Sequence, residues 1–171
     1  ADLLERNVAL NGQQGWVRVV RQAVSDSVGE AAFHCFKYEQ GSSTLRSIER
    51  LRLQELGDQV AVVNVPTVTL DAYFAHTDLR IDVVKMDAEG AEPLILAGMR
   101  EVLERNPKLI LIMEFATEMI RQSAGDPRSF ALEIERLGYQ THFITRTGAL
   151  RRVNADELVA TGFCDVVLRP T

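Results

Sequence analysis

The sequence predicts an α/β fold built on a doubly wound, mainly parallel sheet. Strand-like apolar runs alternate with segments of helical periodicity, which is the pattern of a parallel sheet with helices on both faces. Two runs, residues 81–86 and 108–115, are mainly apolar without regular alternation, as expected for strands that are buried on both faces. A chain of 171 residues fits one domain, so we treat 1–171 as a single unit.

The first part of the chain predicts a helix followed by several strands. One face of the helix is apolar, and the helix ends at Asn11-Gly12, a common C-terminal stop signal. The segments predicted to follow are a strand at 16–26, a strand at 27–38, a short helix at 44–56, an extended run at 60–69 and a helix from residue 70.

Residues 81–99 predict a strand, a turn and a helix. After Asp82, Lys85 is the only interruption of the apolar run up to Met86, and Asp87 follows directly. From Glu92 the apolar residues recur at helical spacing as far as residue 103, with Pro93 suited to the first turn. Gly90 predicts a backbone conformation that other residues resist, or close packing of the helix and strand.

Residues 108–170 continue the alternation of predicted strands and helices. In order, they are a strand at 108–115, a helix at 127–138, a strand at 139–146, a turn and short helix at 147–162, and a strand at 163–170. Because the linker between the last two strands is short, we expect an antiparallel edge at the C-terminus.

Composition narrows the possible partners and location. The hydrophobic fraction of 46% and charged fraction of 25% are those of a globular protein, and no apolar run is long enough for a membrane span. A net charge of -5 argues against nucleic acid as the main partner. Cys35 and Cys164 lack metal-ligand spacing, which favours buried thiols in a reducing cytoplasm.

Two carboxylates follow the two most apolar strands. Asp87 ends one strand and Glu114 the next, so on neighbouring strands their ends would lie about 5 Å apart. Such a pair could take a proton from a hydroxyl, hold a divalent cation or bind a cationic ligand. Alternatively, Asp87, Glu89 and Glu92 complement the positive end of the following helix, and Glu114 is a solvated strand end.

The segment DVVKMDAEGAEPLILAGM, residues 82–99, resembles the hallmark motif of FkbM-type methyltransferases. The matching positions are Lys85, Asp87, Glu89, Gly90, Glu92, Leu96 and Gly98. Further segments resemble the family in the same order along the chain, among them LLERNVALNG, QAVSDSVGEA, VPTVTLDAYF and LILIMEF.

The resemblance implies a Rossmann-like class I methyltransferase with S-adenosylmethionine as its cofactor. It implies methylation of a hydroxyl oxygen on a small molecule or sugar. Asp87 would lie beside the reactive end of the cofactor, and Ala23 and Val24 would line its adenine. We assign Glu89 and Glu114, together with Asp87, as catalytic residues that orient the substrate or remove its proton, and we assign no metal ligand.

The family begins with a strand, a glycine-rich turn, a helix and a second strand ending in an acid, and none of these is found in 1–171. We therefore expect the chain to be the C-terminal part of a catalytic domain. Residues 81–86 would then form an exposed strand edge prone to self-association, and 1–171 alone would bind the cofactor weakly. The alternative is a noncatalytic α/β module used for binding or assembly.

Overall fold

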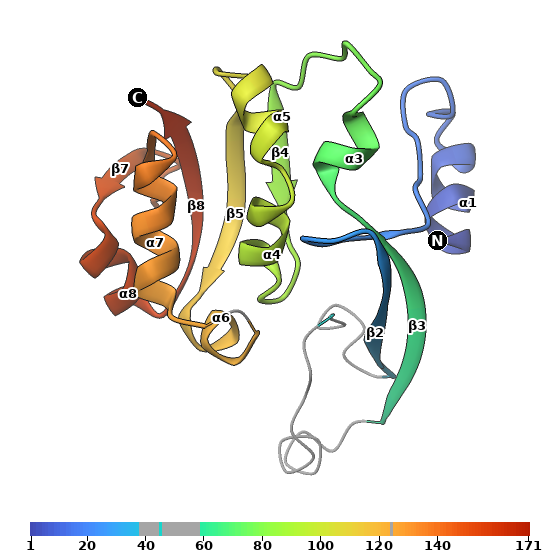
Figure 1. Ribbon diagram of the computed structural model, residues 1–171, viewed down its shortest axis with the longest axis horizontal. Coiled ribbons are helices and arrows are strands. Elements are labelled where there is room, and N and C mark those ends of the chain that lie inside the picture. The colour runs from blue at the N-terminus through green and yellow to red at the C-terminus, as the bar shows by residue number, and fades with distance from the viewer. Residues whose placement is uncertain (38–44, 46–58, 124) are drawn as a thin grey trace.

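The computed structural model describes residues 1–37, 45, 59–123 and 125–171, and Figure 1 shows their arrangement. The helices are α1 (Asp2–Leu10), α3 (Leu70–Phe74), α4 (Glu92–Ala97), α5 (Arg100–Arg105), α6 (Thr117–Ser123), α7 (Pro127–Arg136) and α8 (Ala155–Thr161). The strands are β1 (Ala23–Val24), β2 (Gly29–Phe36), β3 (Val60–Val68), β4 (Val83–Met86), β5 (Ile110–Ala116), β6 (Tyr139–Ile144), β7 (Leu150–Val153) and β8 (Phe163–Pro170).

The α/β class is confirmed, but the strands form two sheets. The smaller sheet has the order β1-β3-β2 and the larger has the order β4-β5-β8-β6-β7. Most of the helix predicted at 44–56 lies outside the described residues. Among the described helices, none has the length and apolar character needed to cross a membrane.

The larger sheet is mixed, so the prediction of a mainly parallel, doubly wound sheet is wrong. β4 and β5 run parallel, whereas β8 lies between β5 and β6 and runs antiparallel to both. β7 pairs antiparallel with β6 across a short loop and forms the edge. A parallel neighbour needs a crossover of roughly a dozen residues or more. The short C-terminal connections therefore favour the antiparallel edge that the sequence predicts.

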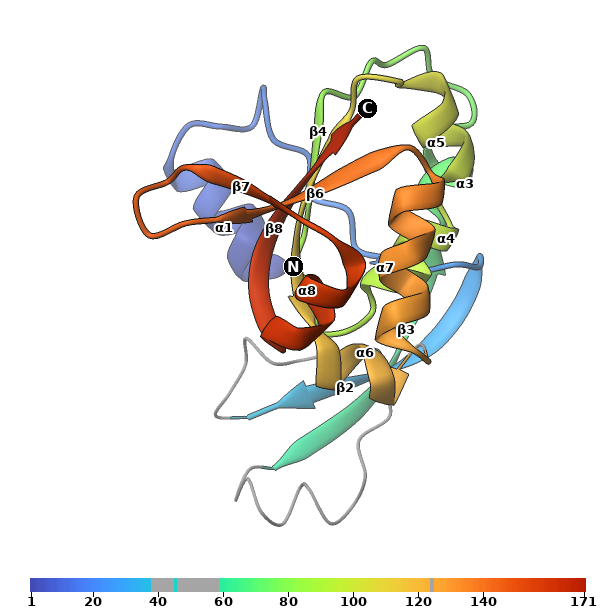
Figure 2. The same ribbon diagram turned by 90° about the vertical axis from the view of Figure 1, so that its left-hand side faces the viewer.

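The hydrophobic core lies on one face of the larger sheet. Residues of β5 alternate between buried and partly exposed, and the buried ones pack with side chains of α4, α5, α7 and α8. Figure 2 shows α4, α5 and α7 together beside one face of this sheet. Val83 of β4 is 52% exposed and Lys85 is exposed. Burial on both faces is therefore not found, and β4 is an edge strand of its sheet.

The predicted strand at 16–26 is reduced to β1. Ala23 pairs with Thr67 and Val24 with Val68, parallel to β3, while β2 runs antiparallel along the other side of β3. The segment before β1 lies beside α1, where Arg21 forms ion pairs with Asp2 at 2.5 Å and Glu5 at 2.7 Å. Because a strand needs a neighbour along its length, these residues stay irregular.

The helix predicted from Glu92 is divided into α4 and α5 at Gly98. A Cβ atom at Gly98 would overlap the carbonyl oxygen of Ser25 and lie 3.2 Å from Cβ of Thr69. Two hydrogen bonds tie the same junction to α3: the Asp71 N–H donates to the Gly98 carbonyl at 3.0 Å, and Asp71 Oδ1 accepts from the Val102 N–H at 2.8 Å. This junction joins the two sheets.

Candidate active site

A pocket of about 410 Å³ lies where the smaller sheet meets β4 and α4. The three residues assigned to the cofactor from the sequence, Ala23, Val24 and Asp87, all line it. The other lining residues, which the sequence did not assign to the cofactor, are Phe33, Leu45, Leu70, Val84, Lys85, Met86, Ala88, Ala91 and Ile95. They come from several separate segments, and only the fold brings these together.

The pocket has an apolar interior and a charged mouth. Val24, Leu70 and Val84 pack against the hydrophobic core, and Met86 is buried. Lys85 and Asp87 form an exposed ion pair at the end of β4, with 2.7 Å between Nζ and Oδ2. The pocket can therefore hold a ligand that is apolar at one end and charged at the other.

Beside the pocket, the catalytic residues assigned from the sequence form one cluster. Each of Asp87, Glu89 and Glu114 offers a carboxylate oxygen within 4.8 Å of the other two. The cluster forms because β4 and β5 are parallel neighbours, with Met86 opposite Met113, so that their carboxyl ends meet. Oxygens at this spacing could accept a proton, hold a divalent cation or contact a cationic group.

The surroundings of Glu114 raise its proton affinity. Burial, followed by the negative charges of Glu89 and Asp87, raises the pKa of the Glu114 carboxyl above its ordinary value. The hydrogen bond to Asp87 raises the pKa of Lys85, which therefore stays charged. Glu114 is thus a stronger base than an ordinary glutamate.

Asp87 and Glu89 are carried by an unusual turn between β4 and α4. Glu89 has φ 51° and Gly90 has φ 94°, so both lie in the left-handed region, which favours glycine. A Cβ atom at Gly90 would lie 2.9 Å from Cβ of Met119 in α6. The left-handed backbone predicted for Gly90 is therefore found. The close contact at Gly90 is with α6, which the sequence did not predict, and not between the helix and strand of the prediction.

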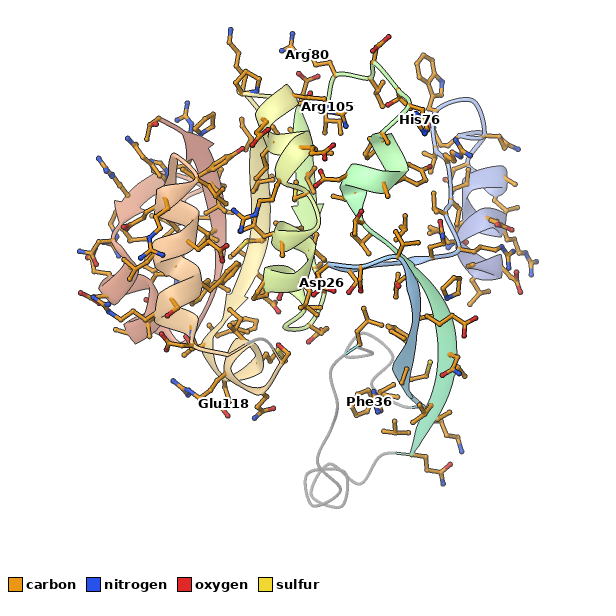
Figure 3. All side chains as sticks on the ribbon, viewed as in Figure 1. Asp26, Phe36, His76, Arg80, Arg105 and Glu118 are labelled. Carbon is orange, nitrogen blue, oxygen red and sulfur yellow. The ribbon has the colours of Figure 1, made fainter. Side chains whose placement is uncertain are left out.

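Basic residues gather at the opposite end of the sheet. Figure 3 shows Arg80 and Arg105 far from Glu118, which lies on α6 near the carboxyl ends of β4 and β5. A second pocket, of about 220 Å³, is lined by Arg80, Arg105 and Lys108 among others. Arg80 pairs with Asp82 at 2.9 Å, and Arg105 donates to the Phe74 carbonyl. Arg80 and Arg105 therefore serve local structure.

Residues 1–141 match the family model described as the methyltransferase FkbM domain. The α/β fold, with its pocket at the end of β4, is thus that of a protein of the methyltransferase class. The chain belongs to the FkbM methyltransferase family, as the motif at 82–99 predicted. Comparisons with curated proteins and with solved structures gave no match.

The raised pKa of Glu114 predicts a pH-dependent loss of stability. A carboxyl whose pKa is higher in the folded state stabilises the fold below its unfolded pKa, and this contribution disappears as pH rises through the folded pKa. The free energy of unfolding of E114Q, relative to that of the natural protein, should therefore increase between about pH 4 and pH 7.

Urea unfolding at a series of pH values measures this difference. E101Q, at an exposed position of α5, controls for the loss of one negative charge. A difference between E114Q and the natural protein that is the same at every pH would contradict the raised pKa.

Proposed function

We propose that the protein transfers a methyl group from S-adenosylmethionine to a hydroxyl oxygen of a small molecule or sugar. The observation that carries this proposal is the junction of the pocket with the carboxylate cluster at Asp87. Family membership supports methyl transfer. The donor and the acceptor are those that the resemblance to the family implies.

The residues of the pocket fit the proposed cofactor. Its volume of about 410 Å³ is within the range of cofactor sites, and its apolar interior near Ala23 and Val24 suits an adenine ring. The carboxylate of Asp87 at the mouth suits a sulfonium cation. When bound, S-adenosylmethionine supplies an activated methyl group.

The proposed roles of the other acids follow from their charge and position. A hydroxyl oxygen becomes a better nucleophile when a carboxylate within hydrogen-bond reach accepts its proton. Burial and neighbouring charge raise the pKa of Glu114, which makes it suitable as this base. Glu89, in the same cluster, orients the acceptor by accepting a second hydrogen bond.

The test uses protein expressed from the complete natural reading frame. Calorimetry measures binding of S-adenosylmethionine, and radiolabelled methyl donor reports transfer to a panel of sugars and small alcohols. We expect saturable binding and label on a hydroxyl oxygen. Absence of cofactor binding would reject the proposal in favour of a noncatalytic module, and label only on nitrogen or sulfur would reject the hydroxyl acceptor.

A further inference from the structure

Glu92 is enclosed by the protein, although it closely follows the acids of the site. The residue is 1% exposed, and its Oε1 accepts the Ala88 N–H at 2.9 Å. This hydrogen bond runs backwards across the turn, from the first residue of α4 to the residue after Asp87. The buried carboxylate of Glu92 therefore stabilises the turn that carries Asp87 and Glu89.

The same turn is held from the outside by α6. The Ser123 hydroxyl donates to the Gly90 carbonyl, and Met119 packs where a side chain at Gly90 would stand. The left-handed conformation of Glu89 is costly for a residue with a side chain. Such a conformation persists only where the surroundings hold it from several directions.

We propose that Glu92 is a positioning residue, whose carboxylate fixes the turn and thereby holds Glu89 beside Glu114. The consequence for catalysis rests on the proposed function. If the turn relaxed, Glu89 could leave the left-handed region, and the cluster with Glu114 would open.

Substitutions of Glu92 can test its hydrogen bond and its charge separately. Oε2 has no hydrogen-bond partner in the described part of the chain. A glutamine would keep an oxygen that accepts from Ala88 and would remove the charge. Leucine or methionine would fill a similar volume without any acceptor. E92Q, E92L and E92M therefore isolate the role of the accepted bond.

Nuclear magnetic resonance tests the position of the turn without turnover. We expect the Ala88 amide to exchange slowly in the natural protein and E92Q, and at least about tenfold faster in E92L or E92M. The titration midpoint of Glu114 should be lower in E92L than in E92Q, because Glu89 is no longer held nearby. The charged groups around Glu114 are Lys85, Asp87, Glu89, Glu92 and Asp165.

E101L, an apolar replacement at an exposed position of α5, serves as the matched control and should behave as the natural protein. Equal exchange at Ala88 and equal Glu114 midpoints in E92L and E92Q would overturn the proposal. So would failure of both E92L and E92M to fold, because Glu92 would then be a requirement of the fold itself.

Methyl transfer provides the second readout. In E92L we expect kcat to fall about a hundredfold while KM for S-adenosylmethionine changes less than about threefold, because a small misplacement of reacting groups affects the chemical step. E92Q should keep kcat within about fivefold. A native kcat in E92L, or an equal loss in E92Q, would overturn the positioning role. Absence of transfer by the natural protein would reject only the proposed function.

Discussion

Replacement of Asp87 by asparagine is expected to lower methyl transfer about a hundredfold or more, with little effect on stability. Asp87 lines the pocket and belongs to the carboxylate cluster. Its charge can therefore act on both the proposed cofactor and the proposed acceptor. The substitution also leaves Lys85 without its partner, which makes the mouth of the pocket more positive. An exposed ion pair contributes at most about 1 kcal/mol to stability, so the fold should tolerate the change.

The chain offers a matched control for this substitution. Arg80 and Asp82 form a similar exposed ion pair before β4, also with the base two residues before the acid, at 2.9 Å. D82N removes the same charge and the same type of pair, but at the end of β4 away from the pocket. We expect D82N to transfer methyl groups at the natural rate.

Steady-state measurements of the methyl-transfer rate and urea unfolding of D87N and D82N test this prediction. The prediction requires a loss of rate in D87N alone, with both variants about equally stable. If D87N retained a rate within about threefold of D82N, Asp87 would have no part in the reaction.

Replacement of Gly98 by alanine is expected to destabilise the protein by about 3 kcal/mol, near the upper end of typical overpacking costs. The new Cβ atom would overlap the carbonyl oxygen of Ser25, which belongs to the backbone and cannot turn away as a side chain could. Relief requires the α4–α5 junction to separate from the segment that follows β1. Because Val24 precedes Ser25 and lines the pocket, cofactor binding should weaken as well.

Gly15→Ala is the control for this prediction. A Cβ atom at Gly15 would have nothing within 4 Å, so we expect a change of less than about 0.5 kcal/mol. Urea unfolding measures both variants, and calorimetry with S-adenosylmethionine measures the effect on the pocket. Equal unfolding midpoints in the two variants would show that Gly98 does not join the two sheets.

Local signals in the sequence were sufficient for most elements. Asp126 caps the N-terminus of α7, Pro127 stands at its first position, and Gly138 with φ 83° follows its end, so the boundaries predicted at 127–138 are close. Thr69 likewise caps α3 where the extended segment ends. In each case the side chain and its hydrogen-bond partner are near neighbours in the chain.

Long-range contacts explain the elements that the sequence misassigned. The strand predicted at 16–26 has the residue types of a strand, but β3 offers it a partner only at Thr67 and Val68. The helix predicted from Glu92 has continuous helical periodicity, yet close contact with Ser25 divides it at Gly98. Neither Thr67 nor Ser25 is adjacent in sequence to the segment that it shapes.

For the site, the sequence placed Glu114 at the end of the long strand after Asp87, whereas β5 continues to Ala116. The sequence by itself did determine that Asp87 directly follows a strand, within the motif at 82–99 that resembles the methyltransferase family. Residue type and periodicity carry that information, because they act over a few residues. The tertiary structure alone decided that β8 lies between β5 and β6, that helices cover one face of the sheet, and that α6 and Glu92 clamp the turn at Glu89. Strand partners and packed faces depend on burial and hydrogen bonding between distant segments, which local propensity does not encode.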